Sequence, residues 1–314
     1  MRLRVLSARD VRAALDMPAA IEAMRAAFGQ LSGGRARVPR RIRVEAESGV
    51  TLVMPGFLEE GAALGAKLVS VFEGNRALGL PAIQGILLLL DGRTGAPLAV
   101  LDGIELTALR TGAATGLAGE FLADPKASVL AVFGAGAQAR TQVEAVRAVR
   151  AVAEVRIVSR SRESAERLAR ELAAGRRGRG GTPGVRVFEA PAEALRGADL
   201  VVAATSSATP VFDGADVERG AHVSSIGAYT PEMREVDAVT VRRARVVVDA
   251  RDGALAEAGD LIAPIREGIL GPEDVVELGE IVNGTAPAGR AARCPGCPGA
   301  GRPPRRPGAG GPPG

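Results

Sequence analysis

The sequence predicts an α/β protein built from two folded domains. One is a doubly wound parallel sheet, and the other is a second α+β domain with a mainly antiparallel sheet. Three observations lead to this prediction. Short strands separated by turn residues fill the first hundred positions, strands and helices alternate after residue 125, and the apolar strand 129–133 runs into a glycine-rich turn.

The first domain is expected to span residues 1–124. A strand and a helix are predicted over 3–31, with Asp16 as the N-cap and Pro18 in the first helical turn. Short strands divided by turns favour antiparallel pairing, and a helical pattern at 105–122 follows them. The predicted strands cover 42–44, 50–54, 66–72, 85–90 and 97–100, with a hairpin-like turn at 91–95.

The second domain is expected to span residues 125–290. Its alternating strands and helices are typical of a parallel, doubly wound sheet, the Rossmann architecture. The Gly- and Arg-rich segment 175–184 is predicted to be a mobile loop. The predicted strands cover 129–133, 155–158, 185–188, 200–204, 222–226 and 245–248, and the predicted helices 138–149, 164–172 and 192–195.

The turn after strand 129–133 has the spacing Gly134-x-Gly136-x-x-Ala139, which is a dinucleotide-binding fingerprint. Gly134 permits the tight turn, Gly136 lets the backbone approach a diphosphate, and Ala139 keeps the helix close to the strand. The free N–H groups at the helix start would bind the diphosphate. The alternative is a purely structural turn, but the preceding strand and following helix favour nucleotide binding.

Composition is that of an ordinary globular chain, with 46% hydrophobic and 24% charged residues. Arg293, Arg302, Arg305 and Arg306 account for the whole formal net charge of +4, so we expect no basic face and no nucleic-acid partner. No apolar stretch is long enough to span a bilayer or resembles a signal peptide. Both cysteines lie near the end of the chain, and we expect a cytoplasmic protein without membrane attachment.

Eight segments are similar to a known family, and two of them are specific: the helix ALRTGAAT and the turn GAGAQA at this separation. On these segments the chain resembles the ornithine cyclodeaminase/mu-crystallin family. The resemblance implies NAD(P)-linked enzymes that act on small amino acids or cyclic imines as homodimers. The segments are GAKLVSVFEGN (65–75), GLPAIQG (79–85), DGRTGAPLAVLDG (91–103), LTALRTGAATGLA (106–118), FGAGAQA (133–139), ADLVVAATSS (198–207), IGAYTPEMREVD (226–237) and ELGEIVNGTAPAGR (277–290).

The resemblance places the substrate site on three cationic residues. Arg41 stands where the family's P-x-R motif binds a substrate carboxylate, and Arg110 stands in the family's R-T pair. Two guanidinium groups suit a carboxylate, which accepts bidentate hydrogen bonds. Lys67 lies in an apolar strand, where burial and the arginines would lower its pKa and fit it to pass a proton to a nitrogen. Without the resemblance, Arg41 would also fit a solvated strand face, and Lys67 would also fit an exposed edge strand.

The end of the second parallel strand decides between nicotinamide cofactors. An acidic residue there would bind the ribose 2′-OH of NAD. This chain has Ser159, Arg160, Ser161 and Arg162 instead, which suit a 2′-phosphate, so NADP(H) is preferred and NAD(H) is possible. The resemblance adds further cofactor contacts at Ala82, Thr111, Gly134, Ala135, Gly136, Ala137, Gln138, Thr205, Ser206, Ser225, Gly227 and Tyr229.

Tyr229 departs from the family pattern. Family cyclodeaminases carry a catalytic Asp and a Lys in a G-x-D-x-P-G-K stretch, and this chain has Tyr229 and Met233 there. A phenol replaces a carboxylate poorly because it keeps its proton at neutral pH. We therefore expect reduction of a cyclic ketimine carboxylate such as pyrroline-2-carboxylate, or amino-acid oxidation. The alternatives are ornithine cyclodeamination and a mu-crystallin-like NADPH-binding protein without turnover.

Two remaining features carry no expected chemistry. His222, the one histidine, begins a strand and is interpreted as structural, so neither a His-based acid–base group nor a metal site is expected. Residues 291–314 contain only Ala, Arg, Cys, Pro and Gly, with one isolated CxxC pair, and we expect disorder there. The tail lacks the family's closing T-V-F-x-S-x-G-x-A-x-x-D segment, and we hypothesise a frameshift. Absence of that motif from the gene's other frames would contradict it.

Overall fold

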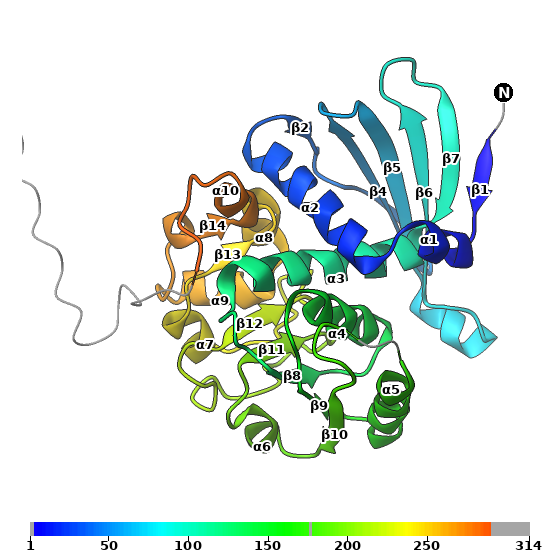
Figure 1. Ribbon diagram of the computed structural model, residues 1–314. Helices are drawn as coiled ribbons and strands as arrows, with labels where there is room; N and C mark the ends of the chain where they lie inside the picture. Colours follow the sequence, from blue (N-terminus) through cyan, green and yellow to red (C-terminus); the bar gives the residue numbers. More distant parts are fainter. Residues whose placement is uncertain (1–2, 176–177, 290–314) are drawn as a thin grey trace, which may run out of the picture.

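The computed structural model describes residues 3–175 and 178–289. It contains two large sheets, one from residues 4–102 and one from residues 129–225, and helix α3 (Gly103–Leu122) lies between them (Figure 1). The predicted tail, its CxxC pair and part of the predicted loop at 175–184 lie outside the described residues.

The first sheet has the strand order β1-β7-β6-β5-β4-β2, with β3 paired to β4. Its neighbours are antiparallel except β1 and β7, which confirms the predicted mainly antiparallel sheet. Asp16 caps α2 as predicted, because its carboxylate accepts from the backbone N–H of Ala19. The elements are β1 (Arg4–Leu6), α1 (Ala8–Ala14), α2 (Met17–Ser32), β2 (Ala36–Arg37), β3 (Ile42–Ala46), β4 (Gly49–Leu58), β5 (Ala63–Val71), η1 (Glu73–Leu78), β6 (Ile83–Asp91) and β7 (Pro97–Asp102).

Strand register assigns the two faces of this sheet. Lys67 pairs with Met54 on one side and Leu87 on the other, and Leu87 pairs with Leu101, so these residues share a face. Leu101 packs into the core made with α2 and α3. Lys67 therefore lies on the sheet face that α3 covers, since cross-strand partners point the same way.

The second sheet has the order β10-β9-β8-β11-β12, and all its pairs are parallel. This is the predicted doubly wound sheet, and β8 has the predicted bounds. Its core is built from small and branched apolar side chains, such as Leu130, Val132 and Ile157, all fully buried. The elements are β8 (Val129–Phe133), α4 (Ala137–Val149), β9 (Glu154–Val158), α5 (Arg162–Ala174), β10 (Gly184–Phe188), α6 (Pro191–Leu195), β11 (Leu200–Ala203) and β12 (His222–Ser225).

The predicted strand at 245–248 does not join this sheet. Only Val247 and Val248 are extended, and they pair with Val276 and Glu277 in a separate two-stranded sheet. The sequence pattern shows apolar residues there but not the strand with which they pair, which lies 29 residues further along the chain. The remaining elements are α7 (Ala238–Arg243), β13 (Val247–Val248), α8 (Arg251–Glu257), α9 (Gly259–Arg266), η2 (Pro272–Asp274), β14 (Val276–Glu277) and α10 (Leu278–Val282).

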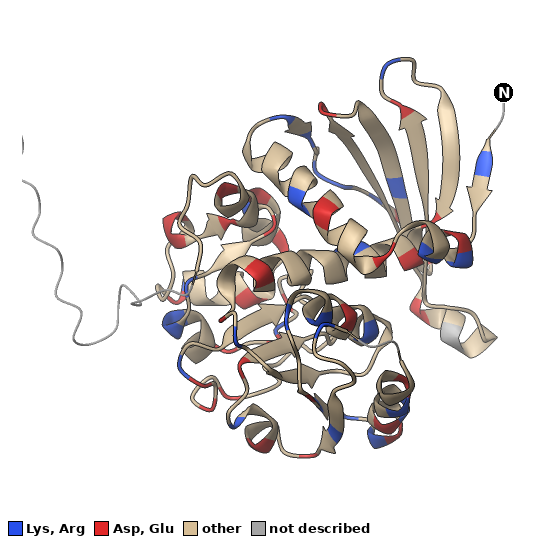
Figure 2. Ribbon diagram, viewed as in Figure 1, with Lys and Arg blue, Asp and Glu red and all other residues tan. Residues whose placement is uncertain are grey.

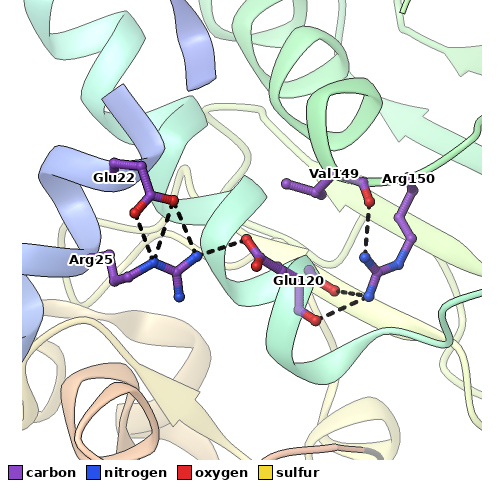
Figure 3. Close-up of polar contacts among 6 residues, drawn as sticks. Glu22, Arg25, Glu120, Val149 and Arg150 are labelled. Carbon is purple, nitrogen blue, oxygen red and sulfur yellow. Dashed lines mark hydrogen bonds and ion pairs between the residues drawn. The ribbon is translucent and has the colours of Figure 1, made fainter. Parts of the chain in front are cut away.

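Helix α3 joins the two halves because it packs closely against α4. A Cβ on Gly112 would come within 2.6 Å of the backbone oxygen of Thr141, so only glycine permits this approach. At the C-terminal end of α3, the buried Arg150 donates to the backbone oxygens of Gly119 and Glu120 (Figure 3). A cation there satisfies the last carbonyl groups of the helix and favours its dipole.

Arg25 links α2 to the same end of α3. Its guanidinium lies between Glu22 of its own helix and Glu120 of α3, to which it donates at 2.9 Å (Figure 3). The last part of the described chain also returns to α2. Asn283 donates to the backbone oxygen of Gly29 at 2.9 Å, and Leu278 packs into the α2–α3 core.

Positive and negative residues are mixed along the helices, whereas strands β4 to β7 carry few charged residues (Figure 2). Within the described ranges, no helix is long and apolar enough to cross a membrane.

Candidate active site

The predicted cofactor site lies at the carboxyl edge of the second sheet. Gly134, which follows β8, has a φ of 102°, and a Cβ there would lie 2.4 Å from the backbone oxygen of Ala204. Only glycine therefore fits between the ends of β8 and β11. These two strands flank the point where the strand order reverses, which is where doubly wound sheets bind their ligands.

The start of α4 has the features that a diphosphate requires. Gly136 is the N-cap, has no side chain to cap the helix, and has open space where a Cβ would lie. Ala139 is fully buried against the sheet, as predicted. The side-chain oxygen of Gln138 is buried without a hydrogen-bond partner in the described chain. Uncapped N–H groups and an open backbone at Ala135–Gln138 are the features that the diphosphate of a dinucleotide would require.

A buried carboxylate that the sequence reasoning missed shapes the ends of the next two strands. Glu235, fully buried, accepts from the backbone N–H groups of Thr205, Ile226 and Gly227 and from the hydroxyls of Thr205 and Ser225. Three of the predicted cofactor contacts, Thr205, Ser225 and Gly227, thus donate to the same carboxylate, that of Glu235. Ser206, which follows Thr205, is exposed.

Asp260, also buried and also missed, holds Glu235 in place. Its Oδ1 accepts from the backbone N–H of Glu235 at 2.7 Å, and its Oδ2 lies 2.5 Å from Ser225 Oγ, the hydroxyl that also faces Glu235, so the two buried carboxylates share one serine proton. Both carboxylates accept from backbone N–H groups that lie at least eight residues away in the sequence, so no local motif indicates their role.

The segment after β9 places the four predicted 2′-phosphate residues at the same edge of the sheet. Ser161 caps α5 by accepting from Ser164, and Ser159 accepts from the backbone N–H of Ser161. Arg162 is bound to Glu166 and Glu189, whereas Arg160 is exposed and no ion pair is seen for it among the described residues. Arg160 is therefore the side chain better placed to bind a new anion.

Lys67, Arg41 and Arg110 lie within electrostatic reach of one another, as predicted. Burial, then the charges of Arg110 and Arg41, lower the pKa of Lys67 to about 8. Loss of hydration also lowers the pKa of Arg110, although part of the residue is exposed, and the charge of Asp249 opposes this effect. Strand β5, helix α3 and the link before β3 thus bring three cations within electrostatic reach of one another.

Arg41 precedes β3 and is bound to Glu257, the last residue of α8. Its Nε donates to Oε1 of Glu257 at 2.7 Å, and its Nη2 pairs with Oε2. Burial, and then the charge of Arg43, lower the pKa of Arg41, whereas Tyr229 raises it. The hydrogen bond to the Glu257 carboxylate favours the charged form of the guanidinium. Tyr229 is thus a neighbour of the cationic site, with an exposed ring.

The other predicted positions have simpler surroundings. Thr111 follows Arg110 on α3 and is partly buried, and Ala82 is buried where its carbonyl accepts from Phe72. His222 begins β12, its Nε2 lies 3.1 Å from Ser224 Oγ, and burial lowers its pKa to about 4. In the described part of the chain, no group of three or more His, Cys, Asp or Glu side chains could hold a metal ion.

A model of the ornithine cyclodeaminase/mu-crystallin family matches residues 1–293. The chain belongs to this family. Among its members, Delta(1)-pyrroline-2-carboxylate reductase of Bacillus cereus is 37% identical over 284 residues, which cover 89% of this chain and 86% of that protein.

Two solved structures of the ornithine cyclodeaminase/mu-crystallin family have the same fold. Delta(1)-pyrroline-2-carboxylate reductase of Thermococcus litoralis, in complex with NADH and L-proline, superposes with a TM-score of 0.85 at 36% identity, covering 92% of this chain and 88% of that one. An archaeal alanine dehydrogenase dimer with bound NAD also superposes with a TM-score of 0.85, at 32% identity, covering 93% and 88%. These matches confirm the predicted family, whose members include nicotinamide-dependent oxidoreductases.

The lowered pKa of Lys67 can be measured directly, because Lys67 and Lys126 are the only lysines in the sequence. In protein labelled with ¹³C at lysine Cε, one signal should titrate with a midpoint near pH 8. It should vanish in Lys67→Met and remain in Lys126→Arg. A Lys67 midpoint at the ordinary value near 10.4 would show that the site does not desolvate this amine.

Proposed function

We propose that this protein reduces cyclic ketimine carboxylates of the pyrroline-2-carboxylate type with NAD(P)H. The observation that carries the proposal is Lys67, whose pKa is lowered to about 8 beside two guanidinium groups. An amine that titrates near neutral pH can give up a proton to an imine nitrogen, and the guanidinium groups can bind the substrate carboxylate. The relatives named as pyrroline-2-carboxylate reductases support the same substrate class.

In the proposed reaction, the two arginines bind the substrate and the lysine donates a proton. Arg41 and Arg110 bind the carboxylate and orient the ring, which supplies much of the acceleration by positioning. The Lys67 ammonium donates its proton to the ring nitrogen. The bound nicotinamide supplies hydride to the adjacent carbon. The C=N bond thus gains one hydride and one proton and becomes the secondary amine of an imino acid, while Lys67 is left neutral and regains a proton from water.

The same groups also allow amino-acid oxidation, which runs the steps in reverse with neutral Lys67 as the base. The archaeal alanine dehydrogenase supports this alternative. Ornithine cyclodeamination is less well supported, because Tyr229 and Met233 replace the Asp and Lys of that reaction. A mu-crystallin-like NADPH-binding role without turnover is the non-enzymatic alternative.

We propose NADPH as the preferred cofactor, with Arg160 as the residue that selects it. Arg162 is already held by Glu166 and Glu189, so its charge is largely compensated. Arg160 is exposed after β9, at the position where a 2′-phosphate is read in doubly wound sheets. The related structures carry NADH and NAD, so NAD(H) stays the second possibility.

We also propose a homodimer that forms through the sheet face opposite Lys67. Ile42 and Ile86 share that face through the pairing Ile42–Val53–Leu68–Ile86, and Val44 lies two residues along the same strand. All three apolar side chains are exposed, which favours burial against a partner. In this proposal residues 1–124 bind substrate and form the dimer, residues 125–290 bind the cofactor, and the protein acts in the cytoplasm.

Reduction of pyrroline-2-carboxylate by NADPH tests the function, followed as loss of NADPH absorbance. Lys67→Met or Arg110→Ala should lower kcat/KM by roughly two to four orders of magnitude, since each removes a proton donor or a carboxylate ligand. Because Lys67 must be protonated to donate, kcat/KM should fall as pH rises above about 8. Near-wild-type turnover in both variants would rule out this mechanism, and NADPH binding without any turnover would favour the binding role.

Cofactor selection is tested by exchanging the two arginines separately. Arg160→Ser should lower kcat/KM with NADPH about tenfold or more, because a charge-assisted hydrogen bond is lost, and should leave NADH nearly unchanged. Arg162→Ser is the matched control and should have a smaller effect on NADPH. A wild-type kcat/KM more than tenfold higher with NADH than with NADPH would contradict the preference.

Sedimentation velocity tests the dimer. The wild type should sediment with twice the chain mass of 32.1 kDa, and the double variant Val44→Asp/Ile86→Asp as a single chain, because each chain would bury two carboxylates in the interface. Val239→Asp changes an exposed residue of α7 and should stay dimeric. A monomeric wild type, or an unaffected double variant, would exclude this interface.

A further inference from the structure

Glu257 holds the guanidinium of Arg41 along one edge only. The contacts run from Nε to Oε1, at 2.7 Å, and from Nη2 to Oε2. They use the Nε–H and one N–H of Nη2, and leave two N–H groups on Nη1 and one on Nη2. The remaining edge can therefore still bind a second carboxylate with two parallel hydrogen bonds.

The segment that carries Glu257 is itself fixed at both ends. At the start of α8, Arg251 donates to Glu280 at 3.0 Å, which ties the helix to α10. Just beyond α8, Asp260 is buried and accepts from the backbone of Glu235 at 2.7 Å. Glu257 is thus a carboxylate on a supported element, and Arg41 lies in the link between two strands of the other half.

The charge of a carboxylate also acts on the other arginine of the site. Asp249, two residues before α8, is the acidic group that most favours the charged form of Arg110. The short segment 249–257 therefore offers one carboxylate to each arginine of the site. Paired countercharges of this kind reduce the repulsion among three clustered cations and fix the direction of long side chains.

We infer that Glu257 is a positioning residue, which orients the Arg41 guanidinium so that its free edge receives the substrate carboxylate. The inference rests on the proposed function. Removing Glu257 would have two opposing effects: Arg41 would lose its fixed direction, and the site would gain positive charge. The pair is partly exposed, at 21% for Arg41 and 39% for Glu257, so water and salt weaken the charge effect and the loss of direction dominates.

The variant Glu257→Gln tests this, with Glu45→Gln as a matched control. Glu45 pairs with Arg43 at 3.0 Å, two residues after Arg41 in the sequence, so each variant removes one negative charge from an arginine–glutamate pair. Glu257→Gln should raise KM for pyrroline-2-carboxylate roughly tenfold, with kcat and KM for NADPH within about twofold of wild type. Glu45→Gln should leave all three near wild type.

A double variant separates positioning from direct substrate contact. In an Arg41→Ala background, Glu257→Gln should change kcat/KM no further, because its effect passes through Arg41. A lower KM in Glu257→Gln would mean that Glu257 competes with substrate, and an unchanged KM would mean that it does nothing. Either result would overturn the inference, as would additive losses in the double variant.

A readout that needs no turnover distinguishes this inference from the proposed function. The Arg41 Nε–H signal in ¹⁵N NMR, assigned by its loss in Arg41→Lys, should be protected from solvent exchange in wild type and in Glu45→Gln. It should lose protection in Glu257→Gln. If no cyclic imine is reduced, the proposed function fails, and this signal still decides whether Glu257 holds Arg41. An unprotected wild-type signal would refute the inference.

Discussion

Three positive charges brought to one place are the constraint on which the arrangement of this molecule depends. Lys67 comes from β5, Arg110 from α3 and Arg41 from the link before β3. Burial, and then the charges of the two arginines, lower the pKa of the lysine to about 8. Such a cluster is costly unless carboxylates lie nearby. Asp249 and Glu257 supply them from the opposite half of the chain, so the fold must hold both halves in register around α3.

The sequence pattern predicted the parts of the fold that depend on local regularity. Strand β8 has the predicted bounds, Asp16 caps α2, and the glycine turn has the backbone that its spacing requires. The pKa of Lys67 is lowered for the predicted reason, because a lysine in an apolar strand beside arginines can hardly avoid desolvation. These features are readable because each is decided within a few residues or by a resemblance to a known family.

The features that the sequence did not reveal depend on distant partners. Glu257 meets Arg41 across 216 positions, and nothing near either residue marks the pair. Glu235 and Asp260 resemble ordinary surface acids in the sequence, but both are buried and hold the loops after β11 and β12. Strand β13 was assigned to the wrong sheet, since two residues of β pattern cannot identify their neighbour.

The return of the last described segment to α2 bears on how the protein can be dissected. Leu278 fills part of the core beneath α2, and Asn283 binds the carbonyl of Gly29. A fragment that stops after α3 would leave that apolar stripe facing water, even though it contained every strand of the first sheet. The amino-terminal half should thus need the carboxyl-terminal residues in trans, as in a split protein that regains its fold only when both pieces are mixed.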